Sequence, residues 1–202
     1  MNDKYRNFIE LTDNETEGRD FQVRLKRVSS SNVVIIAPHG GGIEPRTSEI
    51  AERIAAEKYS LAIFEGLKTI NNRDLHITST NFDEPRCLEI VGSSDYAIAI
   101  HGERSRGSVV FIGGLYAGLK DLITINLEQS GFVVEEHENP ALQGNSPNNI
   151  CNKGRLNKGV QLEVSRGLRD HLFQQSGRND EQPLDKFVLG IQTAIEGNEL
   201  LD

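Results

Sequence analysis

Short strand-like apolar runs alternate with helical segments along this chain, and that alternation restricts its possible folds most strongly. The strand-like runs are residues 33–37, 61–64, 96–100, 109–112, 132–136 and 160–164. Helical periodicity or helix start and stop signals mark residues 47–58, 84–92, 115–129 and 183–201. Continuous β-branched runs such as 33–37 are typical of strands buried on both faces. The order predicts an α/β fold, a single three-layer domain with a mixed, mainly parallel central sheet.

Two further segments complete this outline. Residues 21–25 alternate apolar and polar side chains, which predicts a half-buried edge strand near the N-terminus. Residues 138–158 are rich in Asn, Gly and Pro and show no helical or strand period. A loop of that length inside a compact domain is usually functional or disordered.

Length and composition bound the function. The chain has 202 residues, which predicts one domain over 1–202, and it is 37% hydrophobic and 26% charged, as globular proteins are. Its net charge of −8 repels nucleic acid and anionic lipid, so we expect neither as a partner. A polyanionic partner would need a local basic groove.

Targeting signals and a disulfide framework are not visible. No run of about 18 uncharged apolar residues is present, and no hydrophobic signal region follows the N-terminus. We therefore expect a cytoplasmic, monomeric protein that does not contact a membrane. Cys87 and Cys151 lie far apart and lack a nearby cysteine partner, so they are predicted to be reduced structural thiols.

A histidine and a glutamate flank three glycines just after the first buried strand. His39 precedes Gly40, Gly41 and Gly42, and Glu44 follows. Glycines allow a short loop to bring an imidazole and a carboxylate to one point, and this pair suits Zn²⁺. The same glycines could instead form an anion cradle at the start of the next helix.

His101 favours the metal interpretation. It ends the strand-like run 96–100 and is followed by Gly102, as His39 is followed by Gly40. If the two strands are neighbours, both imidazoles emerge at one sheet edge. His39, Glu44 and His101 then provide two histidines and a glutamate, a ligand set that leaves one position open for catalysis.

Glu163 is the predicted general base. It lies in the run 160–164, where alternation places Gln161 and Glu163 on the face opposite Leu162. A carboxylate on a largely buried strand must be paired, desolvated or functional. An ion pair with Arg166 or Arg169 is the structural alternative.

The segment 71–80 is unusually rich in hydrogen-bond donors. Arg73 offers a bidentate fork for a carboxylate, and Thr78 and Ser79 offer hydroxyl groups. His76 could form a hydrogen bond to a metal ligand, or donate a hydrogen bond to the transition state. We predict that these four residues bind substrate, although a solvated loop would have the same composition.

Four stretches together resemble the phage and Bacillus poly-γ-glutamate hydrolase family. They are Pro38–Glu44, Leu75–Pro85, Ala99–Gly102 and Lys158–Val164, and they occur in the family's order. The resemblance implies a zinc peptidase that cuts γ-glutamyl amides, with a core related to carboxypeptidase A. It also implies His39, Glu44 and His101 as metal ligands and Glu163 as the base. The spacing between His39 and Glu44 departs from the short His-x-x-Glu of carboxypeptidases.

The resemblance has consequences for substrate binding. Poly-γ-glutamate carries a free carboxylate on each residue, so an acidic protein must hold it with local cations. The predicted cations are Arg73, Arg104, Arg106, Arg155 and Lys158. A protein without a secretion signal would meet this extracellular polymer after cell lysis.

Two other functions remain open. A zinc amidase or deacylase of small N-acyl amino acids would share every ligand and differ in groove length. A non-enzymatic phage replication or nucleic-acid-binding protein would use the glycines as a phosphate cradle, and the acidic net charge weighs against it.

Overall fold

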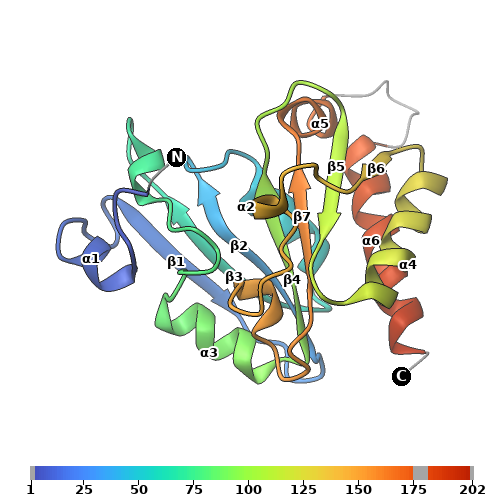
Figure 1. Cartoon of the computed structure of the whole chain (residues 1–202), viewed down its shortest axis with the longest axis horizontal. Coiled ribbons are helices and arrows are strands. Elements are labelled where there is room, and N and C mark those ends of the chain that lie inside the picture. The colour runs from blue at the N-terminus through green and yellow to red at the C-terminus, as the bar shows by residue number, and fades with distance from the viewer. Residues whose placement is uncertain (1–2, 175–181, 201–202) are drawn as a thin grey trace.

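The computed structural model describes residues 3–174 and 182–200, whose strands form one sheet in the order β1-β3-β2-β4-β7-β5-β6 (Figure 1). The strands are β1 (Phe21–Lys26), β2 (Val33–Gly41), β3 (Ser60–Gly66), β4 (Tyr96–Gly102), β5 (Val109–Gly113), β6 (Val133–Glu135) and β7 (Val160–Val164). The pairs β2–β3, β2–β4, β4–β7 and β5–β6 are parallel. The pairs β1–β3 and β5–β7 are antiparallel. The predicted mixed, mainly parallel sheet is confirmed, with β1 as its edge strand.

Helices cover both faces of the sheet, as a three-layer domain requires (Figure 1). One face packs against α2 (Thr47–Ala55), α4 (Ala117–Gln129), α5 (Arg166–Leu172) and α6 (Pro183–Glu199). The other face packs against α1 (Phe8–Thr12), α3 (Pro85–Ser93) and the short 3₁₀ segment η3 (Ile150–Asn152). Two more 3₁₀ segments are η1 (Asn72–Leu75) and η2 (Pro140–Leu142). Each face buries its own apolar cluster.

Several element ends differ from the sequence prediction. Helix α2 ends at Ala55 rather than near residue 58, because Ala56 adopts a positive φ of 39°. Helix α5 was not predicted, since its seven residues are too short to show a clear period. The predicted end of the last helix, Leu201, lies outside the described residues.

Strand β2 continues through the first two of the three glycines. Gly40 and Gly41 pair with Glu65 and Gly66 of β3, after a register shift that begins beyond Ala37. Gly41 has a φ of 61°, and a Cβ there would lie 2.5 Å from the Gly66 carbonyl oxygen. His39 therefore lies within an irregular stretch of strand, rather than in a loop that follows the strand.

Part of the long segment 138–158 packs against the sheet, while residues 138–141, 147–148 and 155–157 are exposed. It contains η2 and η3, and Ile150, Cys151 and Asn152 are buried. Cys87 and Cys151 are both buried and free, as predicted. Within the described residues, no helix is long and apolar enough to cross a membrane.

Candidate metal centre

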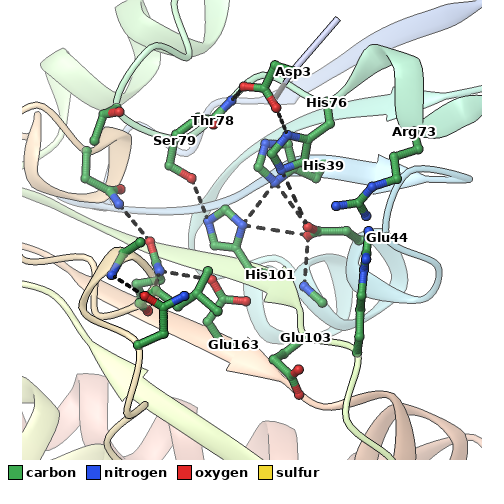
Figure 2. A pocket seen from close by; sticks show the side chains of 18 of the residues that line it. Asp3, His39, Glu44, Arg73, His76, Thr78, Ser79, His101, Glu103 and Glu163 are labelled. Atoms are coloured by element: carbon green, nitrogen blue, oxygen red, sulfur yellow. Dashed lines mark hydrogen bonds and ion pairs between the residues drawn. The ribbon is translucent and has the colours of Figure 1, made fainter. Parts of the chain in front are cut away.

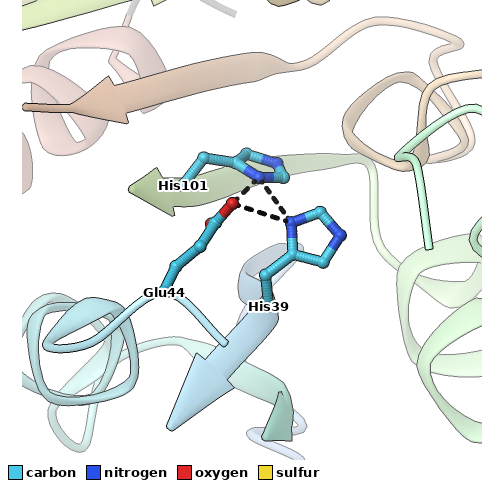
Figure 3. A group of neighbouring side chains, drawn as sticks. All are labelled: His39, Glu44 and His101. Atoms are coloured by element: carbon cyan, nitrogen blue, oxygen red, sulfur yellow. Dashed lines mark hydrogen bonds and ion pairs between the residues drawn. The ribbon is translucent and has the colours of Figure 1, made fainter. Parts of the chain in front are cut away.

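Three side chains converge at the carboxyl ends of neighbouring parallel strands (Figure 3). His39 lies in β2 and His101 in β4, which are hydrogen-bonded neighbours, and Glu44 lies in the loop after β2. His39 Nδ1 is 3.1 Å from His101 Nδ1 and 3.4 Å from a Glu44 carboxylate oxygen. The other Glu44 oxygen is 3.7 Å from His101 Nδ1. The two strands are neighbours, which is the condition for their histidines to meet at one sheet edge, and their adjacency brings these side chains together.

The donor atoms fit a tetrahedral zinc site. Ligands at the usual Zn–N and Zn–O distances are separated from one another by about 3.3–3.5 Å, close to the spacings here. His39 Nε2 lies 2.8 Å from the Ile77 carbonyl oxygen, which only accepts, so Nε2 carries the proton and Nδ1 presents its lone pair. His101 Nε2 faces the Ser79 hydroxyl at 3.4 Å, which leaves Nδ1 toward the same point. Such outer partners are typical of metal-binding histidines.

Glu44 is held as an anion by its surroundings. Burial raises its pKa, but His39 and His101 outweigh that effect and keep the pKa well below its usual range. The Gly102 backbone N–H donates to Glu44 Oε2 at 2.8 Å. Thr47, the first residue of α2, donates its hydroxyl to the Glu44 carbonyl and so holds the ligand loop against the helix.

The glycines do not form an anion cradle. The Gly41 N–H donates to Ser48 Oγ, and the Gly42 N–H donates to the Gly66 carbonyl. The Glu44 N–H donates to the His39 carbonyl. These backbone donors are used inside the protein, and the phosphate-binding alternative therefore lacks its main structural support.

Arg169 connects the loops that carry the site. Its buried guanidinium donates to the carbonyl oxygens of Val164 in β7, Glu103 after β4 and Pro45 after Glu44. The predicted alternative of an Arg169–Glu163 ion pair is therefore replaced by three hydrogen bonds to backbone. Because each carbonyl belongs to a different strand end, one side chain fixes their relative positions.

Glu163 lies beside the three converging side chains, on β7 (Figure 2). It is the register partner of His101 on β4, and Gln161 Nε2 donates to its Oε1 at 3.0 Å. Gln161 and Glu163 face away from Leu162, which packs in the core, as alternation predicted. Burial raises the pKa of Glu163 well above its usual range, and the nearby charge of Glu44 adds to this effect.

A pocket of about 560 Å³ surrounds these groups. The predicted residues Arg73, His76, Thr78 and Ser79 all line it. The His76 ring stacks on His39 with 4.0 Å between centroids. Burial lowers the pKa of His76 to about 4, so its neutral ring donates Nδ1–H to Asp3 at 2.7 Å.

Only some of the predicted cations reach the pocket. Arg73 and Arg104 line it. Burial and the nearby charge of Arg104 lower the pKa of Arg73. Arg155 instead pairs with Asp95 at 2.8 Å, and Lys158 lies over the Tyr116 ring. Arg106 is not among the lining residues. Arg155 and Lys158 do not line the pocket because their loop folds back toward the start of β4.

Sequence reasoning missed Asp3 and Asn149 as residues of the site. It also missed that Arg169 links the loops of the site. Asp3 also accepts the Thr78 backbone N–H at 2.6 Å, although 75 residues separate the two. Polar residues near a terminus or within an Asn-rich loop carry no periodic signal that would have marked them.

A family model described as poly-gamma-glutamate hydrolase matches residues 5–190. The chain belongs to the poly-gamma-glutamate hydrolase family. Its fold agrees with that of a solved structure described as a bacteriophage poly-gamma-glutamate hydrolase. The TM-score is 0.92, and the sequences are 31% identical over the full length of both chains. The membership assigns the protein to a family of hydrolases.

Two further comparisons are with proteins named YndL, and the curated YndL sequence is from Bacillus subtilis (strain 168). The curated sequence is 42% identical over 173 residues, which are 85% of this chain and 67% of that protein. The chain thus spans about two thirds of the length of this curated relative. A YndL structure described as apo and zinc-free aligns with a TM-score of 0.87 and 36% identity, covering 98% of this chain and 99% of that one.

Proposed function

We propose that this hydrolase cleaves the γ-glutamyl amide bonds of poly-γ-glutamate in a zinc-dependent reaction. The observation that carries the proposal is the convergence of His39, Glu44 and His101 beside the buried carboxylate of Glu163, in one pocket. Family membership supplies the substrate class. The YndL structure is described as apo and zinc-free, which supports zinc as the metal to test.

His39, Glu44 and His101 would hold the zinc ion. The lone pairs of the two Nδ1 atoms and the ionised carboxylate form a donor set suited to Zn²⁺. When bound, zinc polarises an amide carbonyl and lowers the pKa of water. The hydrogen bonds from His39 Nε2 to Ile77 and from Gly102 to Glu44 keep these donors aimed at one point.

Glu163 would act as the general base and then as the acid. Its raised pKa makes the carboxylate a better proton acceptor than an exposed glutamate. It takes a proton from the attacking water and delivers that proton to the leaving amine nitrogen. Its position beside His101 puts this transfer next to the metal ligands.

The donor-rich wall of the pocket would bind the substrate. Arg73 and Arg104 provide guanidinium groups for the free carboxylates of the polymer. His76, Thr78 and Ser79 form the adjoining wall, and Ser79 also supports His101. Because the net charge is −8, local cations must outweigh the surrounding field.

Chain-length analysis of purified poly-γ-glutamate after incubation with the protein tests this function. We expect shortening of the polymer that a chelator abolishes and added Zn²⁺ restores. Activity on small N-acyl amino acids with no shortening of the polymer would favour the deacylase alternative. An undiminished rate with the chelator, and with zinc absent by elemental analysis, would contradict the zinc dependence.

A further inference from the structure

Three buried polar side chains, Asn149, Gln161 and Glu163, form a hydrogen-bonded series that begins in the long segment 138–158. Asn149 Nδ2 donates to Gln161 Oε1 at 2.8 Å. Gln161 Nε2 donates to Glu163 Oε1 at 3.0 Å and to the Leu142 carbonyl oxygen at 3.0 Å. Both hydrogens and the oxygen of the Gln161 amide are therefore used.

The direction of these hydrogen bonds is determined by backbone groups that can only donate or only accept. The Cys151 backbone N–H donates to Asn149 Oδ1, so Asn149 must turn its amino group toward Gln161. The Leu142 carbonyl accepts only, so Gln161 must turn its own amino group toward Leu142 and Glu163. Either constraint alone orients the Gln161 amide, and the two agree.

We propose that Gln161 is a positioning residue for Glu163, and that segment 138–158 sets its orientation through Asn149 and Leu142. The Gln161 N–H occupies one oxygen of the Glu163 carboxylate and so directs the other oxygen toward the attacking water. The inference rests on the proposed role of Glu163 as the base. It gives the long segment a function without requiring that it touch substrate.

The physical reason is the freedom of a carboxylate group. Rotation about the last side-chain bond of glutamate is only weakly restricted, so packing alone does not aim its oxygens. A general base must lie within hydrogen-bond reach of the proton that it takes. A displacement of about 1 Å can cost about 10²-fold in rate.

A double-mutant cycle tests the proposal. Gln161→Met keeps the side-chain length and removes the amide, and we expect kcat to fall about 10²-fold with little change in KM. In the Glu163→Gln background the same substitution should change kcat by less than about twofold, because the base that Gln161 positions is already lost. Zinc content by elemental analysis should stay at the wild-type value in every variant.

Two further variants separate positioning from general damage. Asn149→Ala removes the donor to Gln161 and should lower kcat less than Gln161→Met, with no added loss in the double variant. Gln192→Met makes the same chemical change on α6, where Gln192 donates to the Ile54 carbonyl, and should leave the kinetics unchanged.

The possible outcomes are distinguishable. Equal losses from Gln161→Met in both backgrounds, or a change confined to KM, would show a separate structural or substrate-binding role and overturn the inference. Near-normal kcat in Glu163→Gln alone would overturn the proposed base, and with it this inference. Loss of zinc in Gln161→Met would also contradict a role limited to Glu163.

Discussion

His101 and Glu163 are register partners on the neighbouring parallel strands β4 and β7. One ladder therefore sets the distance between a proposed metal ligand and the proposed base. A slip of one residue in this pairing would turn the whole β7 side-chain pattern over, placing Glu163 in the apolar cluster of the opposite face and Leu162 on the pocket face. The buried apolar cluster on the other face specifies the register.

Removing His101 should remove the metal. We expect His101→Ala to lose most of its zinc and its activity, because two donors remain where three converged. Elemental analysis measures the zinc content. His171→Ala, at an exposed position in α5, is the control and should keep both. Wild-type zinc content in His101→Ala would refute the ligand assignment.

Replacing the proposed base should separate chemistry from metal binding. We expect Glu163→Gln to retain zinc and to lose about 10²–10⁴-fold in kcat, the usual effect of removing a general base. Steady-state kinetics on defined poly-γ-glutamate, together with elemental analysis, checks both parts. A kcat close to that of the wild type would show that Glu163 has a structural role and is not the base.

Arg73 should contribute to substrate affinity through its guanidinium fork. A charge-assisted hydrogen bond contributes roughly 1.5–3 kcal/mol, so Arg73→Ala should lower kcat/KM by about 10- to 150-fold. Arg73→Lys keeps the charge and should lower it less. Arg155→Ala is the control, since Arg155 pairs with Asp95 away from the pocket. If Arg73→Ala behaves like this control, Arg104 becomes the main candidate.

Arg169 should stabilise both the fold and the metal site. Arg169→Met removes three hydrogen bonds and leaves the Pro45 and Glu103 carbonyl groups without their side-chain donor, while the Val164 carbonyl keeps the Glu103 N–H; the free energy of unfolding should fall by about 3 kcal/mol. Zinc affinity should fall about 10- to 100-fold, because the Glu44 loop loses an anchor. Arg166→Met, at an exposed neighbouring position, should change stability by at most about 0.5 kcal/mol. Denaturant unfolding and zinc titration measure the two effects.

Acid stability should depend on Glu65 of β3. Burial raises its pKa, but hydrogen bonds from Arg24, Gln22 and Ser48 outweigh burial and leave the pKa below its ordinary value. The folded state therefore binds this proton less readily than the unfolded chain does. The stabilisation is full above the ordinary glutamate pKa of about 4.5 and is lost as pH falls through the folded pKa.

Urea unfolding across pH 3–6 checks this expectation, in roughly the range where carboxylates titrate. Glu65→Gln should make the free energy of unfolding less dependent on pH in this interval. The control, Glu57→Gln, alters a carboxylate whose side chain is 98% exposed and should leave the dependence unchanged. An unaltered pH profile in Glu65→Gln would disprove the contribution.

The alternation of apolar runs and helical segments by itself determined the α/β class and the approximate strands. It also placed His39 and His101 at strand ends, because burial patterns and strand termini are local properties of sequence. The period of two in 160–164 likewise put Gln161 and Glu163 on one face.

Only the tertiary structure decided which strands are neighbours and which distant groups complete the site. Nothing local in the sequence places β7 beside β4, brings Asp3 to His76, or turns Arg155 away from the pocket. The sequence marked Arg169 only as an alternative ion-pair partner of Glu163, yet it joins three loops. These contacts join residues far apart in the chain, and their energies depend on burial and geometry that exist only after the sheet has formed.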